Sequence, residues 1–385
     1  MRFKVRCSEC KREYDFEPFI TLCPECSRKN ENDKPFHGIL EFIYRFEKDK
    51  TLYLPFEEKY FPNIKVGNTP LIKPEYFNSI GFKNIFIKDD SLNPTGSLKD
   101  RASYLVAACA RKFNIKEIVV SSTGNAGSSM AGIGAASGIK VKLFVPEKIP
   151  KGKLVQALQY GADVVMVKGN YDKAYDFSLE YSERKKLLSR NTAYNPLTIE
   201  GKKTAAIEIF EELGREPDYV FLPAGDGVIL GGVYKGFAEL YIMGRLKRMP
   251  KIFAVQSDKS PAIANALNEG DFKKINANSI ADSINVDVPK NGYYAISMLR
   301  KYEGECVIVK DEDILDAQIL LSSKTGIFAE PAAAASLSGF MKVKEKIDKD
   351  KIIVLLITGT GLKDIENASK KIKFPEPIKS MDQIK

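Results

Sequence analysis

The sequence contains a single histidine, His37, and no tryptophan among its 385 residues. This scarcity of imidazole removes serine–histidine pairs and histidine-ligated metals from the candidate mechanisms. No run approaches the about 18 uninterrupted apolar residues of a membrane-spanning helix, and the N-terminal MRFKVRCSEC lacks the apolar segment of a signal peptide. We therefore expect a cytoplasmic protein with no membrane partner.

Two further absences concern nucleotides and nucleic acids. No GxxxxGK[ST] motif is present, and the one Gly-rich loop lacks the acidic residue of dinucleotide sites, which argues against ATP and NAD. Lys and Arg exceed Asp and Glu by 59 to 50, a net charge of +9, but the cations are interleaved with acids. Without a repeated basic block or an RNA-binding aromatic signature, we expect no nucleic-acid partner.

Length and composition indicate a folded protein with room for a cleft. Hydrophobic residues make up 44% and charged residues 28% of the chain, as in ordinary globular proteins. A chain of 385 residues predicts two domains and a small appendage.

Four of the six cysteines form two CxxC pairs near the N-terminus, Cys7 with Cys10 and Cys23 with Cys26. Paired knuckles let four thiolates meet one ion tetrahedrally, which predicts a structural zinc ribbon with no open coordination position for catalysis. The alternative is a cap that folds without metal. Cys109 and Cys306 lie in apolar segments and read as buried small residues.

From about Gly67 onward, apolar strand-like runs alternate with helical periodicity. Strands are predicted at 85–88, 118–121, 141–145, 164–167, 219–222, 252–256, 307–309 and 352–357. Helices are predicted, among others, at 97–112, 125–137, 200–213 and 331–343. This alternation predicts an α/β fold with mostly parallel sheets and a ligand site at the carboxyl ends of the strands.

Four loops follow predicted strands, at 93–101, 121–129, 223–232 and 358–364. The first presents Lys99 at the positive end of a helix, where its amine is disfavoured as a cation and could form an imine with an aldehyde cofactor. The others offer hydroxyls, an amide and backbone N–H groups to a carboxylate or phosphate. Each loop considered alone also has a purely structural explanation. Lys99 could be a surface lysine paired with Asp100, and the other loops could be helix caps or turns.

Together these segments resemble the pyridoxal 5'-phosphate (PLP) enzymes of the tryptophan-synthase β fold, fold type II, and within them the threonine synthase family. The likeness covers more than three quarters of the chain, through GNTPL, NPTGSLKDR, SSTGNAGSS, KLVQALQYGA, NPLTIEGKKT, PAGDG, VQSDKSPAI, FAEPAAAAS and TGTGLKD. It implies two interwoven lobes: a large PLP-binding lobe (51–99 and 201–374) and a small lobe (100–200). A zinc-ribbon-like segment (1–50) would precede them, a tail (375–385) would follow, and a homodimer is expected.

The resemblance also assigns roles to residues. Lys99 would hold PLP and act as the base, Asn125 would hydrogen-bond the phenolic oxygen of PLP, and Thr358 would meet its ring nitrogen. The PLP phosphate would bind the loop formed by Gly225, Asp226, Gly227, Val228 and Ile229. A small amino-acid substrate would contact Ser122, Thr123, Gly124, Ala126 and Thr198.

The sequence departs from the family where a substrate phosphate would bind. Thr198 stands where an arginine is usual, Ala126 and Ala193 replace hydroxyl residues, and Asp226 replaces an asparagine. Lys202, Lys203 or Lys153 are the cations that could compensate. Two activities therefore remain open: threonine synthase, acting on O-phospho-L-homoserine, and a threonine/serine ammonia-lyase or β-replacement enzyme. A non-enzymatic regulator or nucleic-acid-binding module is the remaining alternative.

Overall fold

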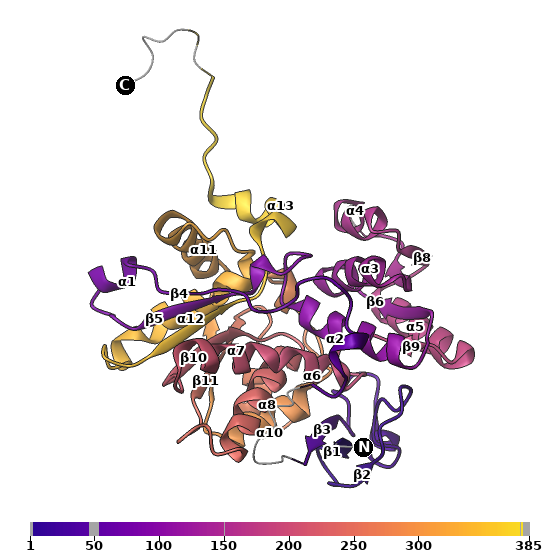
Figure 1. The fold of residues 1–385 in the computed structure, drawn as a ribbon. Coiled ribbons are helices and arrows are strands. Elements are labelled where there is room, and N and C mark those ends of the chain that lie inside the picture. The colour runs from indigo at the N-terminus through magenta and orange to yellow at the C-terminus, as the bar shows by residue number, and fades with distance from the viewer. Residues whose placement is uncertain (1–2, 46–53, 150, 378, 380–385) are drawn as a thin grey trace.

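The computed structural model describes residues 3–45, 54–149, 151–377 and 379. Its strands form three sheets, shown in Figure 1. The predicted boundary at residues 50 and 51 lies outside the described residues, as does most of the predicted tail 375–385. Within the described residues, no helix combines the length and apolarity that crossing a bilayer requires.

The large sheet has six strands in the order β12-β11-β10-β13-β5-β4. Only β4 runs antiparallel to its neighbour; the other pairs are parallel. Every side chain of the central strand β13 is buried, as expected for a parallel strand covered on both faces. The strands are β4 (Leu71–Ile72), β5 (Ile85–Asp89), β10 (Tyr219–Pro223), β11 (Lys251–Ser257), β12 (Glu305–Val309) and β13 (Ile353–Ile357).

The small sheet has four parallel strands in the order β8-β7-β6-β9. They are β6 (Glu117–Ser121), β7 (Lys140–Pro146), β8 (Asp163–Val167) and β9 (Leu188–Ser189). All eight strands predicted from the apolar runs are present in the two sheets, while the two-residue strands β4 and β9 were not predicted. The α/β class with mostly parallel sheets is therefore confirmed.

Helices cover both sheets. On the large sheet, α11 (Asp311–Thr325) packs against α12 (Pro331–Val343), which contacts β10 and β13, whereas α7 (Thr204–Leu213) and α10 (Gly292–Lys301) pack against α8 (Val228–Ile242). On the small sheet, α3 (Asn125–Ser137) contacts β6 and β7, and so does α5 (Tyr171–Lys185). The short helices are α1 (Tyr76–Ser79), α4 (Lys151–Gln159), α9 (Ala262–Glu269) and α13 (Ile365–Ala368).

Two helices connect the lobes: α2 (Lys99–Lys112) packs against α3 and α6, and α6 (Leu197–Lys202) packs against α8. The helix predicted at 200–213 is interrupted at Lys203, which separates α6 from α7. At this point α8 approaches closely, since a Cβ on Gly236 would lie 2.4 Å from the Lys203 carbonyl oxygen. The helix predicted from residue 97 begins at Lys99.

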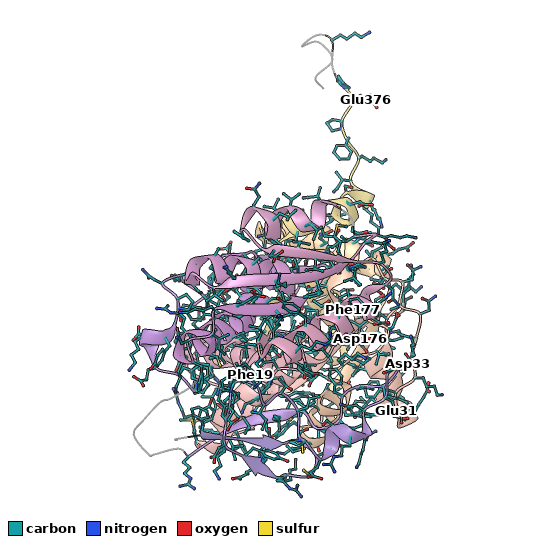
Figure 2. The ribbon with its side chains drawn as sticks, turned by 90° about the vertical axis from the view of Figure 1, so that its right-hand side faces the viewer. Phe19, Glu31, Asp33, Asp176, Phe177 and Glu376 are labelled. Atoms are coloured by element: carbon teal, nitrogen blue, oxygen red, sulfur yellow. The ribbon has the colours of Figure 1, made fainter. Side chains whose placement is uncertain are left out.

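The N-terminal segment forms a three-stranded antiparallel sheet from β1 (Phe3–Cys7), β2 (Glu13–Tyr14) and β3 (Leu40–Tyr44). Its aromatic side chains join the hydrophobic core of the small lobe; Phe16, for example, contacts Phe42 and, at the end of α2, Phe113. In Figure 2, Asp33 of this segment lies on the same face as Asp176 of α5, and the residues around Glu376 extend away from the body.

Candidate active site

The site lies where the strands β5, β6, β10 and β13 end, because parallel strands present their carboxyl ends at one edge. Lys99 is the first residue of α2, and the preceding residue, Leu98, donates its N–H to the carbonyl of Thr358 at 2.9 Å. Desolvation lowers the pKa of Lys99, and the positive charge of Arg190 lowers it further. The Lys99 amine is therefore closer to its neutral, nucleophilic form than an exposed lysine is.

Asn125 begins α3 and connects the lobes. Its Nδ2 donates to both carboxylate oxygens of Glu330, at 3.0 Å each, and to Ser283 Oγ at 3.1 Å. Burial raises the pKa of Glu330, while the bond from Asn125 opposes this rise. Neither Glu330 nor Ser283 was a predicted site residue, although Glu330 belongs to the FAEPAAAAS motif and marks the start of α12.

The loop at the N-terminus of α8 packs closely against neighbouring segments of the protein. Gly227 has φ +84, in the left-handed region that favours glycine, and a Cβ on Gly225 would lie 2.8 Å from the Cα of Ile284. The side chains of Val228 and Ile229 are buried, so these residues offer only their backbone N–H groups. Asp226 Oδ1 accepts the N–H of Val228 at 2.9 Å, which places a carboxylate at this helix end.

A second loop, after β6, carries the predicted substrate contacts. Ser122, Thr123 and Gly124 are partly exposed, and Gly124 N–H donates to Ser122 Oγ at 3.2 Å. Ala126 is also partly exposed on the first turn of α3. Thr198 is fully buried in α6 and donates its hydroxyl to the carbonyl of Asn195 at 2.7 Å, so only its lone pairs could serve a ligand.

Two buried cations that were not among the predicted site residues lie beside Lys99. Arg190 donates through Nη2 to the Lys99 carbonyl at 3.4 Å, and burial lowers its pKa to about 10. Lys202 is fully buried, its Nζ has no hydrogen-bond partner, and desolvation lowers its pKa well below the usual range. Lys203, which like Lys202 was a candidate cation for a substrate phosphate, is instead paired with Glu239 at 2.7 Å. The side chain of Lys153 lies outside the described residues.

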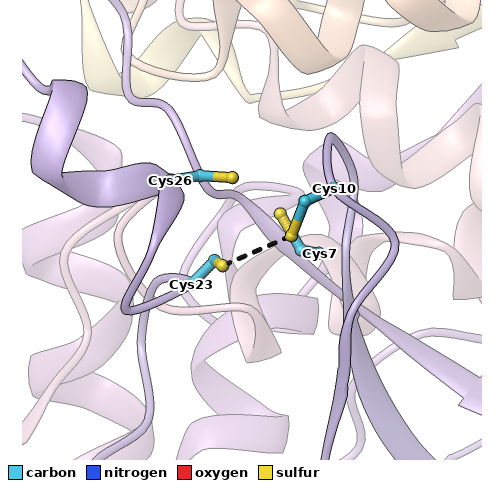
Figure 3. A group of neighbouring side chains, drawn as sticks. All are labelled: Cys7, Cys10, Cys23 and Cys26. Atoms are coloured by element: carbon cyan, nitrogen blue, oxygen red, sulfur yellow. Dashed lines mark hydrogen bonds between the residues drawn. The ribbon is translucent and has the colours of Figure 1, made fainter.

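The four predicted metal ligands come together in the N-terminal segment (Figure 3). All four sulfurs, of Cys7, Cys10, Cys23 and Cys26, lie within 4.8 Å of one another, and Cys10 and Cys23 are 3.8 Å apart. Tetrahedral zinc with Zn–S bonds of about 2.3 Å requires S–S separations of about 3.8 Å, so this donor set fits zinc. Cys7 and Cys10 flank the β1–β2 turn, and Cys26 begins the short helix η1 (Cys26–Lys29).

A family profile described as "Pyridoxal-phosphate dependent enzyme" matches residues 63–359. Solved structures share the fold: maize serine racemase has a TM-score of 0.68 at 20% identity, covering 77% of this chain and 88% of that one. The processed form of threonine deaminase isoform 2 from Solanum lycopersicum has a TM-score of 0.67 at 23% identity, covering 78% and 88%. The fold and the site define a PLP-dependent enzyme of fold type II.

Among curated proteins, the threonine synthase of Methanocaldococcus jannaschii is 35% identical, covering 97% of this chain and 96% of that protein. Those of Methanosarcina acetivorans and Halalkalibacterium halodurans are 33% and 36% identical, over 94% and 82% of this chain and 92% and 88% of theirs. The chain belongs to the threonine synthase family.

The residues of the site fit PLP. The loop before α8 provides backbone N–H groups at a helix N-terminus, and a Cβ at either Gly225 or Gly227 would meet an atom at 2.8 or 2.9 Å. Lys99 would provide a desolvated amine for the aldehyde, and Thr358 directly follows the strand β13.

Proposed function

We propose that this enzyme is a threonine synthase, which converts O-phospho-L-homoserine and water into L-threonine and phosphate. In this reaction the Cγ–O bond breaks and phosphate leaves. Cβ loses one proton and gains the hydroxyl oxygen from water, and Cγ gains a proton to become the methyl group. The observation that carries the proposal is the likeness to threonine synthases, which extends over 97% of the chain.

PLP, when bound, supplies an electron sink for charge that develops at the substrate Cα. Lys99 is the group that we assign to proton transfer at Cα, Cβ and Cγ, because its amine is desolvated and its pKa is lowered.

We assign other residues to binding and orienting the substrate and the cofactor. The loop of Ser122, Thr123 and Gly124 precedes the N-terminus of α3, where hydroxyls and backbone N–H groups favour a carboxylate. We assign Asn125 to the cofactor's phenolic oxygen; its amide is held by Glu330. We assign Thr358 to the ring nitrogen of the cofactor, where its neutral hydroxyl would favour elimination over transamination.

A second candidate activity is that of a threonine/serine ammonia-lyase or a β-replacement enzyme. The observation that favours it is local: Thr198 is engaged with Asn195, and Ala193 is buried in a cluster with Ile39 and Val228. Neither position provides the cation or hydroxyl that a substrate phosphate would require. A smaller substrate without phosphate would not need them.

A paired assay separates the two activities. Holoenzyme is supplied with O-phospho-L-homoserine while inorganic phosphate and threonine are measured, and separately with L-threonine and L-serine while 2-oxo acid is measured. Equal amounts of phosphate and threonine support the synthase. Oxo-acid formation without phosphate release would instead establish the ammonia-lyase.

Two structural proposals accompany the activity. The four cysteines bind one structural zinc, because their geometry suits a closed tetrahedral site. The enzyme forms a homodimer, as expected for its family and as symmetric dimers are the commonest oligomers. Light scattering on purified protein would measure the second of these directly.

A further inference from the structure

Lys202 differs from the other buried lysines of the described structure. Four lysines are buried, and three of them have carboxylate partners: Lys88 with Glu208 at 2.8 Å, Lys203 with Glu239 at 2.7 Å, and Lys235 with Glu239 at 2.6 Å. Lys202 Nζ has no hydrogen-bond partner, although its side chain is fully buried. An ammonium group that is buried without a partner is destabilised. An anion next to Lys202 Nζ would remove this destabilisation.

The side chain of Arg190 also lacks a charged hydrogen-bond acceptor among the described residues. Its guanidinium donates to Ser103 Oγ at 3.1 Å, to Thr192 Oγ1 at 2.8 Å and to the Lys99 carbonyl at 3.4 Å. These acceptors are all neutral, and among the described residues Asp226 and Asp100 act on this fully buried side chain only from beyond ion-pair distance. A guanidinium has five donors in a planar fork that suits a carboxylate or phosphate.

Lys202 lies about one helical turn after Thr198, the position at which an arginine is usual in the family. The two residues are four apart on α6 and therefore share one face of the helix. Helical side chains lean toward the N-terminus, so Lys202 extends over the turn that contains Thr198. Its Cβ also faces α8, since a Cβ on Gly232 would lie 2.8 Å from it.

The charges that act on Lys202 identify its surroundings. They are Lys99 and Arg190, which lower the pKa of Lys202, and Asp226, which opposes this effect and whose carboxylate accepts the N–H of Val228. Asp226 is the carboxylate that acts on Lys202, whereas Glu330 also acts on Lys99 and Asp100 also acts on Arg190. A phosphate group there would give Lys202 Nζ the hydrogen-bond acceptor that it lacks.

We propose that Lys202 and Arg190 form a buried cationic subsite that binds a phosphate group in the crevice, either the leaving phosphate of the substrate or the 5'-phosphate of the cofactor. The subsite rests on the proposed function, because a phosphorylated substrate is one of its two possible ligands. If the ligand is the substrate phosphate, the subsite takes the place of the arginine that is missing at Thr198.

The test compares Lys202→Met with Lys203→Met, two neighbouring buried lysines of which only the second has carboxylate partners. Apoenzyme is titrated with PLP and with pyridoxal, which lacks the phosphate, and holoenzyme is titrated with inorganic phosphate, using visible absorbance and calorimetry. We expect Lys202→Met to fold with a Tm at or above that of the native apoenzyme, because the change removes a buried amine that has no hydrogen-bond partner. Lys203→Met should lower the Tm, since it leaves Glu239 with one partner fewer.

The two phosphate sources give different results. If the substrate is the source, Lys202→Met weakens inorganic phosphate binding to the holoenzyme about 10- to 100-fold and leaves PLP affinity unchanged. If the cofactor is the source, the variant weakens binding of PLP by that factor but not binding of pyridoxal. The subsite is overturned if Lys202→Met binds inorganic phosphate and PLP as the native enzyme does, or if Lys203→Met weakens either equally.

These measurements do not depend on turnover. A native enzyme that binds inorganic phosphate through Lys202 but forms no threonine from O-phospho-L-homoserine would refute the proposed function and keep the subsite. An enzyme that forms threonine, with phosphate and PLP binding insensitive to Lys202→Met, would refute the subsite and keep the function.

Discussion

Adding one methyl group at Gly225 tests whether the loop before α8 holds the cofactor. The new Cβ would lie 2.8 Å from the Cα of Ile284 and 3.2 Å from its carbonyl carbon and oxygen. Carbon atoms in contact are separated by about 3.5–4.0 Å, so the two backbones must part by roughly 0.7–1.2 Å. Ile284 is 2% exposed, which leaves little room for that movement. The displacement also moves Ser283, which accepts a hydrogen bond from Asn125.

The cost follows from overpacking. Inserting a methyl group into a packed site costs about 1–3 kcal/mol. If the loop yields, so that its N–H groups leave their positions, the Kd for PLP rises by about fivefold to 150-fold, since 1.4 kcal/mol is a factor of ten. If the core yields instead, the Tm falls and the Kd changes less. Titration of the apoenzyme with PLP, followed by visible absorbance, and calorimetry measure the two effects separately.

Gly152→Ala is the matched control. Gly152 is exposed in α4, and a Cβ there would meet no atom within 4 Å. The substitution should leave the Kd for PLP unchanged and should leave stability equal or raise it by up to about 1 kcal/mol. A Gly225→Ala enzyme with native Kd and native Tm would refute the assignment of this loop to the cofactor phosphate.

Three further predictions concern charge, metal and pH. Asp226→Asn keeps a cap for α8 but removes a carboxylate from the cradle, so PLP should bind several-fold more tightly in a titration of apoenzyme; weaker binding would mean that this carboxylate serves the cofactor. Cys10→Ser, or a chelator, should release about one zinc per chain in an atomic-absorption assay and lower the Tm, and native protein without zinc would contradict the ligand assignment. The rate at which apoenzyme takes up PLP should rise with pH and level off at a pH below the ordinary pKa of lysine, because the amine of Lys99 must be neutral to react and its pKa is lowered. A rate that still rises through the ordinary pKa would contradict this.

The sequence predicted the longer strands of the two sheets because parallel strands that are buried on both faces consist of continuous apolar runs. The run Ile353–Ile357 is an example. The strands β4 and β9, of two residues each, carry no such run. The helix predicted at 200–213 is interrupted at Lys203, where Gly236 of α8 meets the carbonyl oxygen, a contact that local periodicity does not encode.

The sequence also predicted which loops follow the carboxyl ends of strands. Lys99, Asn125, Gly225 and Thr358 follow different strands, and the β-α alternation places all strand ends at one edge of the sheets. The CxxC spacing likewise predicted the cysteine cluster, because ligand spacing within a tight turn is a local property.

Only the tertiary structure decided the electrostatics of the crevice. Lys202 and Lys203 are adjacent in the sequence and equally buried, yet one has no partner and the other is paired with Glu239, 36 residues away. The contact of Glu330 with Asn125 spans 205 residues. Whether a charge is compensated depends on distances between side chains from different elements, so the physical state of these groups is fixed by packing and not by the residues next to them.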